Sequence, residues 1–315
     1  MNILVIATGG TIGSAFEGAV INVSADRSCA VVELARHEYP DIRFDTIAPL
    51  NMLSERLSAA ELNTLARVIL TTDYAPYDGV IFTVGSDNLG YLAAFIGLLT
   101  ASCPMPVAVV AADKVLSDPE SNGLPNFRAA VAVIRRGTRG AYVPYRNADG
   151  TVYIHAAAEI RQADLSPDFF SLHGAYAVMR DGGIVRQRNY IHHGIPAVFD
   201  RDHLPAITDS VLMIHHYPLL DYDTLDPSGK RAVLHTLYHS ATLDSERAIA
   251  FMRRLGDVPM YLASFIGGHK LYRTAADAIM AGAIPLTDIS PECAYMQLLL
   301  ACAQDGMSVC AFMEV

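Results

Sequence analysis

The sequence predicts an α/β protein: a doubly wound, mostly parallel sheet in an N-terminal domain, followed by a smaller α/β domain. Three observations favour this class. Short apolar runs alternate along the chain with longer amphipathic ones. The short runs are apolar throughout, as in strands that crossover helices bury on both faces. At 315 residues the chain is long for a single core, which favours two domains.

The expected elements of the N-terminal domain alternate between strand and helix. The first apolar run, Ile3–Ala7, predicts a strand because it is short and stops abruptly at glycines. The turn at Asn147–Gly150 predicts a pair of adjacent strands. The other expected strands are Gly79–Val84, Pro106–Ala112, Gly140–Tyr145 and Thr151–Ala156, and the expected helices are Cys29–Glu38, Ala59–Thr72, Leu89–Thr100 and Asn126–Ile134.

The segment 181–209 loses this periodicity and gathers glycine and proline, which is typical of a connection between domains. We therefore expect an N-terminal domain at 1–185, a linker at 186–208 and a C-terminal domain at 209–315. Ser290 is a natural N-cap and Pro291 suits the first helical position, so a last helix is expected to begin there. The other C-terminal elements expected are the strands Val211–His215, Ala232–Leu237 and Pro259–Phe265 and the helices Ser245–Leu255 and Thr274–Ala281.

Composition and charge argue against several classes of protein. The formal net charge is −10, from 33 acidic and 23 basic residues, and no basic run stands out, so nucleic acid is not an expected partner. The five cysteines lack C-x-x-C spacing, which is typical of buried thiols in a reducing compartment. No stretch approaches the ~20 apolar residues of a membrane span, and the N-terminal run is too short for a signal peptide. We expect a cytoplasmic protein with no membrane partner.

The histidines and glycines do not predict a metal or a cofactor. His192-His193 and His215-His216 are adjacent pairs, and neighbours in an extended chain point to opposite faces. His235 and His239 are four residues apart, but no glutamate completes an H-E-x-x-H motif. The N-terminal glycine turn matches neither the phosphate-loop nor the dinucleotide pattern.

The candidate chemistry lies where the expected strands end, because ligands of open α/β sheets bind at the carboxyl ends of strands. The first strand ends at Thr8-Gly9-Gly10-Thr11, where two glycines allow a sharp turn and close approach of a ligand, and where Thr11 could act as a nucleophile. The alternative is an ordinary turn in which Thr11 bonds its own loop. The second strand ends at Gly85-Ser86-Asp87, where Asp87 suits a substrate ammonium, although Ser86 or Asp87 could simply cap the following helix.

These stretches, taken together, resemble the signatures of the bacterial-type L-asparaginase/glutaminase family. Thr8 to Ile12 is similar to its T-G-G-T-I signature, and the run from Gly79 to Asp87 is similar to its second signature, normally H-G-T-D-T. Leu53-Ser54-Glu55 resembles the substrate-binding serine segment. Two further stretches, 117–126 and 281–294, resemble later family segments in the same order, so the resemblance spans nearly the whole chain.

The resemblance implies a fold, an assembly and an activity. The family has a larger doubly wound domain and a smaller α/β domain, and assembles as homodimers or homotetramers with sites at subunit contacts. Its chemistry is hydrolysis of a side-chain amide through an acyl-enzyme. Carried over to this chain, the resemblance implies the following roles: Thr11 as nucleophile, Ser86 as the second hydroxyl, Asp87 as the ammonium ligand, and Ser54, Glu55, Gly10 and Gly85 as substrate-binding positions.

The chain departs from the family pattern at the lysine that partners the second hydroxyl. Counting back from Phe169 places that position near Ile160-Arg161-Gln162, where Arg161 is the basic residue. Arginine stays protonated and cannot accept the hydroxyl proton, but it could orient Ser86. Lys114, at the end of the third strand, is the other candidate, and its alternative is an ordinary loop lysine paired with a nearby carboxylate. The loop after Thr11 also lacks the family's tyrosine.

Three functions are compatible with the sequence. The first is an asparaginase-type amidohydrolase that converts L-asparagine or a near relative to L-aspartate and ammonia, with Thr11 acylated. The second is a weak or inactive family member that binds a small amino acid or acts on another amide, which the missing lysine and tyrosine suggest. The third is an unrelated α/β protein that binds phosphate or a nucleotide. Only general fold analogy supports this function.

Overall fold

The computed structural model describes residues 1–10, 14–17, 20–23, 30–188, 190, 206–267 and 270–304. The chain divides into two compact units, Met1–Leu204 and Pro205–Val315, each with its own parallel or mostly parallel sheet. The division falls within the segment 186–208 in which we expect the linker, although a strand reaches Arg186. The domain boundaries themselves stay a prediction.

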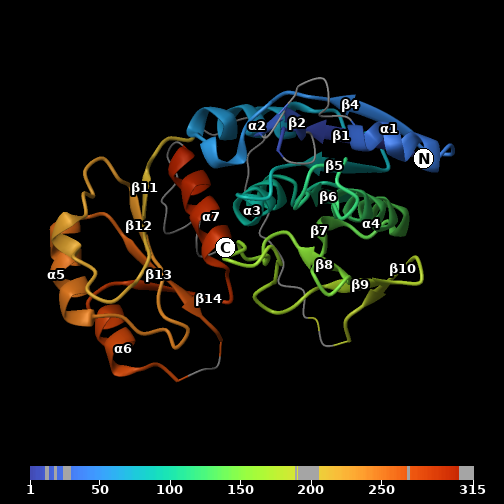
Figure 1. The fold of residues 1–315 in the computed structure, drawn as a ribbon. Coiled ribbons are helices and arrows are strands. Elements are labelled where there is room, and N and C mark those ends of the chain that lie inside the picture. Colours follow the sequence, from blue (N-terminus) through green and yellow to red (C-terminus); the bar gives the residue numbers. More distant parts are fainter. Residues whose placement is uncertain are drawn as a thin grey trace. The chain divides into compact units, whose positions relative to one another are not determined.

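The larger unit is built on an eight-stranded sheet in the order β10-β9-β8-β7-β6-β5-β1-β4 (Figure 1). The five strands from β4 to β7 are parallel, and β8, β9 and β10 add antiparallel pairs. The expected doubly wound, mostly parallel sheet is therefore confirmed. The strands are β1 (Asn2–Ala7), β4 (Arg43–Ile47), β5 (Gly79–Thr83), β6 (Pro106–Val110), β7 (Gly140–Arg146), β8 (Val152–Ala156), β9 (Ala177–Arg180) and β10 (Gly183–Arg186).

Helices cover this sheet because each buries one apolar stripe. Helices α1 (Ala30–Glu38) and α4 (Gly123–Arg136) share an apolar cluster with β1, β5 and β6, whereas α2 (Ala59–Thr71) and α3 (Leu89–Leu99) pack against each other. Ser58 and Glu61 form a capping box that starts α2, and Gly137, in the left-handed conformation, ends α4. Helix α3 is buried along almost its whole length, as its uniformly apolar sequence requires.

The smaller unit repeats the α/β pattern around a four-stranded parallel sheet, β11-β12-β13-β14. Ser290 accepts a hydrogen bond from the backbone N–H of Cys293 and Pro291 is the first residue of α7, so the expected start of the last helix is confirmed. The elements are β11 (Val211–Ile214), β12 (Ala232–His235), α5 (Ser245–Leu255), β13 (Met260–Phe265), α6 (Arg273–Met280), β14 (Ile284–Thr287) and α7 (Pro291–Ala303), with a short 3-10 helix, η4 (Tyr222–Thr224).

Several strands are absent from the sequence prediction. Strands β9 and β10 form a hairpin whose turn residues, Asp181 and Gly182, have φ angles of 49° and 75°. An Asp-Gly pair with two positive φ angles is a type I′ turn, so the loss of periodicity after Asp181 concealed a hairpin. Strand β14 contains Pro285 and is tolerated because it lies at the edge of its sheet. The other unpredicted strands are β4 and the pair β2 (Ser14–Glu17) and β3 (Val20–Val23).

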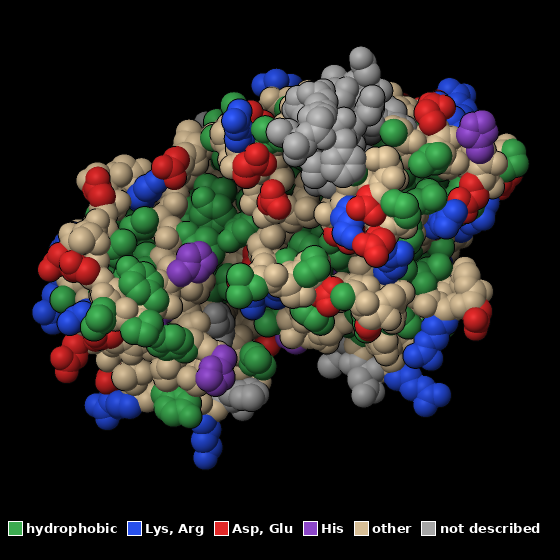
Figure 2. All heavy atoms as spheres, viewed as in Figure 1, with side chains coloured by type: hydrophobic (Ala, Val, Ile, Leu, Met, Phe, Trp, Pro, Cys, Tyr) green, Lys and Arg blue, Asp and Glu red, His purple; other side chains and the backbone are tan. Residues whose placement is uncertain are grey.

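Surface charge, the described cysteines and helix length are the structural features that relate to nucleic-acid binding, disulfide bonds and membrane spans. On the face in Figure 2, basic side chains are scattered among acidic ones and form no continuous basic area. Cys103, Cys293 and Cys302 are buried free thiols, while Cys29 and Cys310 lie outside the described residues. No helix among the described residues is long and apolar enough to cross a membrane.

Candidate active site

The ends of three parallel strands meet at one edge of the large sheet. Ala7 of β1 pairs in register with Thr83 of β5, and Thr83 pairs with Val110 of β6. The loops that leave these strands therefore start side by side, which is the arrangement that forms ligand sites in open α/β sheets.

The glycine turn after β1 packs directly against the turn after β5. Gly9 and Gly10 have φ angles of 106° and 83°, which few other residues adopt without strain. A Cβ atom on Gly10 would lie 2.4 Å from the Cα atom of Gly85, and one on Gly85 would lie 2.5 Å from the Cβ atom of Ser54. Only glycines at both positions allow this approach. Thr11 itself lies outside the described residues.

Thr8 fixes the strand end from which this turn departs. Its backbone N–H and its hydroxyl both donate to the carbonyl oxygen of Thr83, at 3.0 and 2.9 Å. Its own carbonyl accepts from the N–H of Met52 at 3.0 Å, which ties the loop before η3 (Ser54–Arg56) to the same strand end. The first threonine of the signature is therefore buried and structural.

Ser54 and Asp87 are brought together across this junction. The Ser54 hydroxyl donates to the Asp87 carboxylate at 3.2 Å, and the Asn88 side-chain amide donates to the Ser54 carbonyl oxygen. Ser54 is buried, whereas Glu55, the next residue of η3, is exposed. The predicted substrate-binding serine and ammonium ligand thus share one hydrogen bond.

A cavity of about 430 Å³ opens beside Ser86 and Asp87. Asp113, after β6, lines it and is held by Asn122: the carboxylate accepts from the Asn122 N–H at 3.0 Å, and the Asn122 side chain accepts from the Asp113 N–H at 2.9 Å. Burial raises the pKa of the Tyr145 hydroxyl to about 12, so this group stays neutral. The lining residues are Ser86, Asp87, Asp113, Tyr145, Gln162, Ala163, Asp164, Leu165, Ser166, Pro167 and Phe169.

The side chain that bonds the Ser86 backbone is that of Gln162, and neither candidate for the lysine position lines the cavity. The Lys114 ammonium pairs with Glu120, and Arg161 is exposed, with its backbone N–H donating to the Phe170 carbonyl oxygen at 2.8 Å. Of the described residues that line the cavity, none is a lysine or an arginine, and three are aspartates. The site therefore favours a positively charged group, and its side chains of known position include no basic nitrogen that could take a hydroxyl proton.

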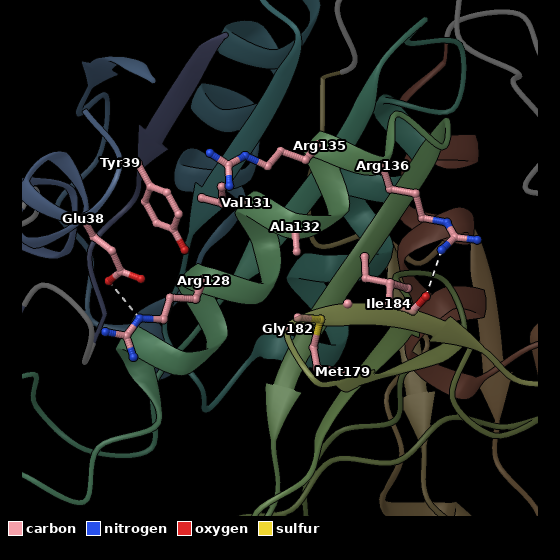
Figure 3. A pocket seen from close by; sticks show the side chains of 11 residues that line it. Glu38, Tyr39, Arg128, Val131, Ala132, Arg135, Arg136, Met179, Gly182 and Ile184 are labelled. Atoms are coloured by element: carbon pink, nitrogen blue, oxygen red, sulfur yellow. Dashed lines mark hydrogen bonds and ion pairs between the residues drawn. The ribbon is translucent and has the colours of Figure 1, made fainter. Parts of the chain in front are cut away.

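A second cavity of the same unit lies against the later turns of α4 (Figure 3). Arg128 points to Glu38 and donates to its carboxylate at 2.9 Å, and Arg136 donates to the Ile184 carbonyl oxygen at 2.9 Å. Arg135 pairs with Asp41 and stacks on the Tyr39 ring. These arginines connect α4 to its neighbours. Among the described residues, no group of three or more histidine, cysteine or acidic side chains could hold a metal ion.

Comparison with known proteins identifies the family. Residues 2–181, more than half of the chain, match the family model described as Asparaginase, N-terminal. The chain belongs to the asparaginase family. The resemblance seen in the sequence is thereby confirmed, and this asparaginase-family protein is an enzyme of the amidohydrolase class.

Individual relatives are distant but cover nearly the whole chain. An L-asparaginase from Thermococcus kodakarensis is 25% identical, over 96% of this chain and 92% of the relative. A glutamyl-tRNA(Gln) amidotransferase subunit from Methanosarcina mazei is also 25% identical, but this chain covers only 73% of its length. The solved structure of a probable cytoplasmic L-asparaginase from Campylobacter jejuni has a TM-score of 0.79 at 19% identity, covering 99% of this chain and 98% of that one.

Asp113, Tyr145 and Gln162 are among the cavity residues that sequence reasoning did not select. Asp113 was not selected, although it follows the third strand at the same edge of the sheet as Ser86, which was a usable signal. Tyr145 ends a strand that was expected, but its ring direction could not be inferred. Gln162 stood beside the residue that was chosen, Arg161, and an offset of one position moves a side chain to the opposite face of an extended segment.

Proposed function

We propose that this family member hydrolyses the side-chain amide of L-asparagine to L-aspartate and ammonia. In this proposal the Thr11 hydroxyl oxygen attacks the amide carbon, and the amide nitrogen takes up the hydroxyl proton and leaves as ammonia when the C–N bond breaks. Water then hydrolyses the threonine ester to release aspartate and restore the hydroxyl. Asp87 binds the substrate α-ammonium, Ser54 and the glycine turns hold the α-carboxylate end, and Ser86 supplies the second hydroxyl.

The observation that carries the proposal is the contact between the three signature segments. Gly10 packs against Gly85 and Gly85 against Ser54 with no room for a Cβ atom on either glycine, and the Ser54 hydroxyl bonds Asp87 at 3.2 Å. Residues that are far apart in the sequence thus converge at the carboxyl edge of the sheet, beside a cavity large enough for an amino acid. The acidic lining supports recognition of an ammonium group.

Replacement of Thr11 by alanine tests the role of the nucleophile. We expect ammonia release from L-asparagine to fall by at least about 10³-fold, because losing a nucleophile removes the covalent route altogether. Thr71→Ala, which removes an exposed hydroxyl from α2, is the matched control and is expected to keep full activity. Unchanged turnover in Thr11→Ala would remove this residue from the mechanism.

A second candidate function is binding, or slow turnover of a different amide. The observation that favours it is that Gln162, and no lysine, bonds the Ser86 turn among the described residues that line the cavity. Some relatives are named as amidotransferase subunits, which is also compatible with a different amide substrate. Stabilisation by L-asparagine without ammonia release would favour this second function.

The main proposal also includes a cytoplasmic location and assembly as a homodimer or homotetramer.

A further inference from the structure

We propose that Gln162 is a positioning residue of the active site: its side-chain amide holds the Ser86 turn and the first turn of α3 in one fixed geometry. This inference rests on the proposed function for its effect on turnover. The contact itself can be tested without substrate.

The side chain of Gln162 bridges the Ser86 turn and the first turn of α3. Its Oε1 atom accepts from the backbone N–H of Gly90 at 3.0 Å, and its Nε2 atom donates to the carbonyl oxygen of Ser86 at 3.4 Å. The Ser86 carbonyl also accepts from the N–H of Leu89 at 3.1 Å. One amide group therefore fixes the turn that carries the Ser86 hydroxyl and the Asp87 carboxylate.

Helix α3 needs this contact because its own N-cap does not provide one. The N–H groups of a first helical turn have no partner within the helix and are usually satisfied by the N-cap side chain. Asn88 is the N-cap of α3, but its side chain makes no capping bond and donates instead to the Ser54 carbonyl oxygen. Gln162 supplies the missing acceptor from a segment that is 72 residues further along the chain.

The backbone around Gln162 is built for close approach to α3. A Cβ atom on Gly90 would lie 2.9 Å from the backbone nitrogen of Gln162 and 3.1 Å from its Cα atom, so a side chain at position 90 would push this segment away. The neighbouring backbone is held from the other side, because Arg161 N–H bonds the Phe170 carbonyl and Leu172 N–H bonds the Glu159 carbonyl, at 2.8 and 2.9 Å. Backbone contacts thus hold residue 162 in place independently of its side chain.

The chemistry of an amide limits what Gln162 can do. A carboxamide neither accepts nor releases a proton in the range where an enzyme works, so it cannot serve as the base for Ser86 or Thr11. It can accept and donate at the same time, which a lysine ammonium, a donor only, cannot do. Gln162 therefore orients Ser86 and Asp87 and takes no part in proton transfer.

Two substitutions separate positioning from simple structural support. Gln162→Glu keeps the acceptor for the Gly90 N–H but loses the donor to Ser86, and Gln162→Ala loses both. We expect amide exchange of Gly90 to stay slow in Gln162→Glu and to speed up in Gln162→Ala. With L-asparagine, we expect both variants to lose about 10- to 100-fold in kcat, with KM within about threefold, because a misplaced catalytic group costs rate more than binding.

A third substitution and a control complete the test. Gln162→Lys places a titratable group beside Ser86, and we expect the pH profile of its kcat to differ from that of the natural protein. Gln187→Ala removes an exposed glutamine of the same unit and should change nothing. Equal Gly90 exchange in the natural protein and Gln162→Ala would overturn the contact. Natural kcat in Gln162→Glu would overturn the positioning role. A natural protein that releases no ammonia contradicts the proposed function and leaves the exchange result to decide the contact.

Discussion

His155 is a buried imidazole that the fold keeps uncharged. Its Nδ1 atom bonds the Ser171 hydroxyl at 2.8 Å, and within the described part of the chain its Nε2 atom has no hydrogen-bond partner. Burial lowers its pKa from 6.5 to about 4. Between these values the unfolded chain binds a proton that the native state does not, so stability is complete above pH 6.5 and falls as the pH decreases towards 4.

We expect His155→Gln to reduce this pH dependence while keeping a partner for Ser171. The imidazole accounts for roughly 3 kcal/mol of the stability lost between pH 6.5 and 4, and the variant should lose that much less over the same interval. Urea unfolding at a series of pH values measures the slope, with the exposed His37→Gln as control. Burial also lowers the pKa of His235, in the smaller unit, to about 4. His235 is present in both proteins, so it contributes equally to the pH dependence of their stability. Identical slopes for His155→Gln and the natural protein would contradict the prediction.

At the scale of elements, the junction of the β1 and β5 turns requires a glycine at position 10 for close packing as well as for its φ angle. Gly10 and Gly150 have nearly the same φ angle, 83° and 80°, but only Gly10 is crowded; nothing lies within 4 Å of a Cβ atom placed on Gly150. Gly150→Ala is expected to cost only the strain of the left-handed conformation, about 1–2 kcal/mol. Gly10→Ala adds overpacking against Gly85, roughly 1–3 kcal/mol more, and should abolish activity. Unfolding free energies of the two variants measure the difference, and equal losses would show that the turns do not touch.

The elements also show how far the sequence could predict this structure. Runs such as Ile3–Ala7 and Pro106–Ala112 predicted their strands because burial on both faces leaves a continuous apolar signal. Strand β4 was missed because its five residues, Arg43–Ile47, mix charged and apolar side chains. The signature glycines predicted the backbone of the site, since a sharp turn and close approach both favour glycine. Gln162 could not be predicted, because its role depends on a loop that reaches the α3 N-terminus only in the folded chain.

At the scale of the whole molecule, the described candidate-site residues all belong to the unit Met1–Leu204. They come from several separate stretches, among them the β1 turn, η3, the β5 turn, the β6 turn and the loop after Ile160. No single element carries the site, so ligand binding and native stability of this unit are expected to be coupled. A ligand that binds only the native state raises its stability by an amount set by concentration and affinity.

L-Aspartate, the proposed product, should therefore stabilise the protein, and succinate should not. The two differ by the α-ammonium, which the proposal places on Asp87 in a cavity that also carries Asp113 and Asp164. At a concentration of about 100 Kd, aspartate contributes about 2.7 kcal/mol, which corresponds to a rise of roughly 5–10 °C in Tm for a unit of this size. Differential scanning calorimetry of the intact chain measures the shift. Asp87→Asn should abolish it, because the neutral amide leaves the ammonium without its charged partner and adds a competing donor. Equal stabilisation by succinate, or an undiminished aspartate shift in Asp87→Asn, would contradict the assignment of Asp87 to the ammonium.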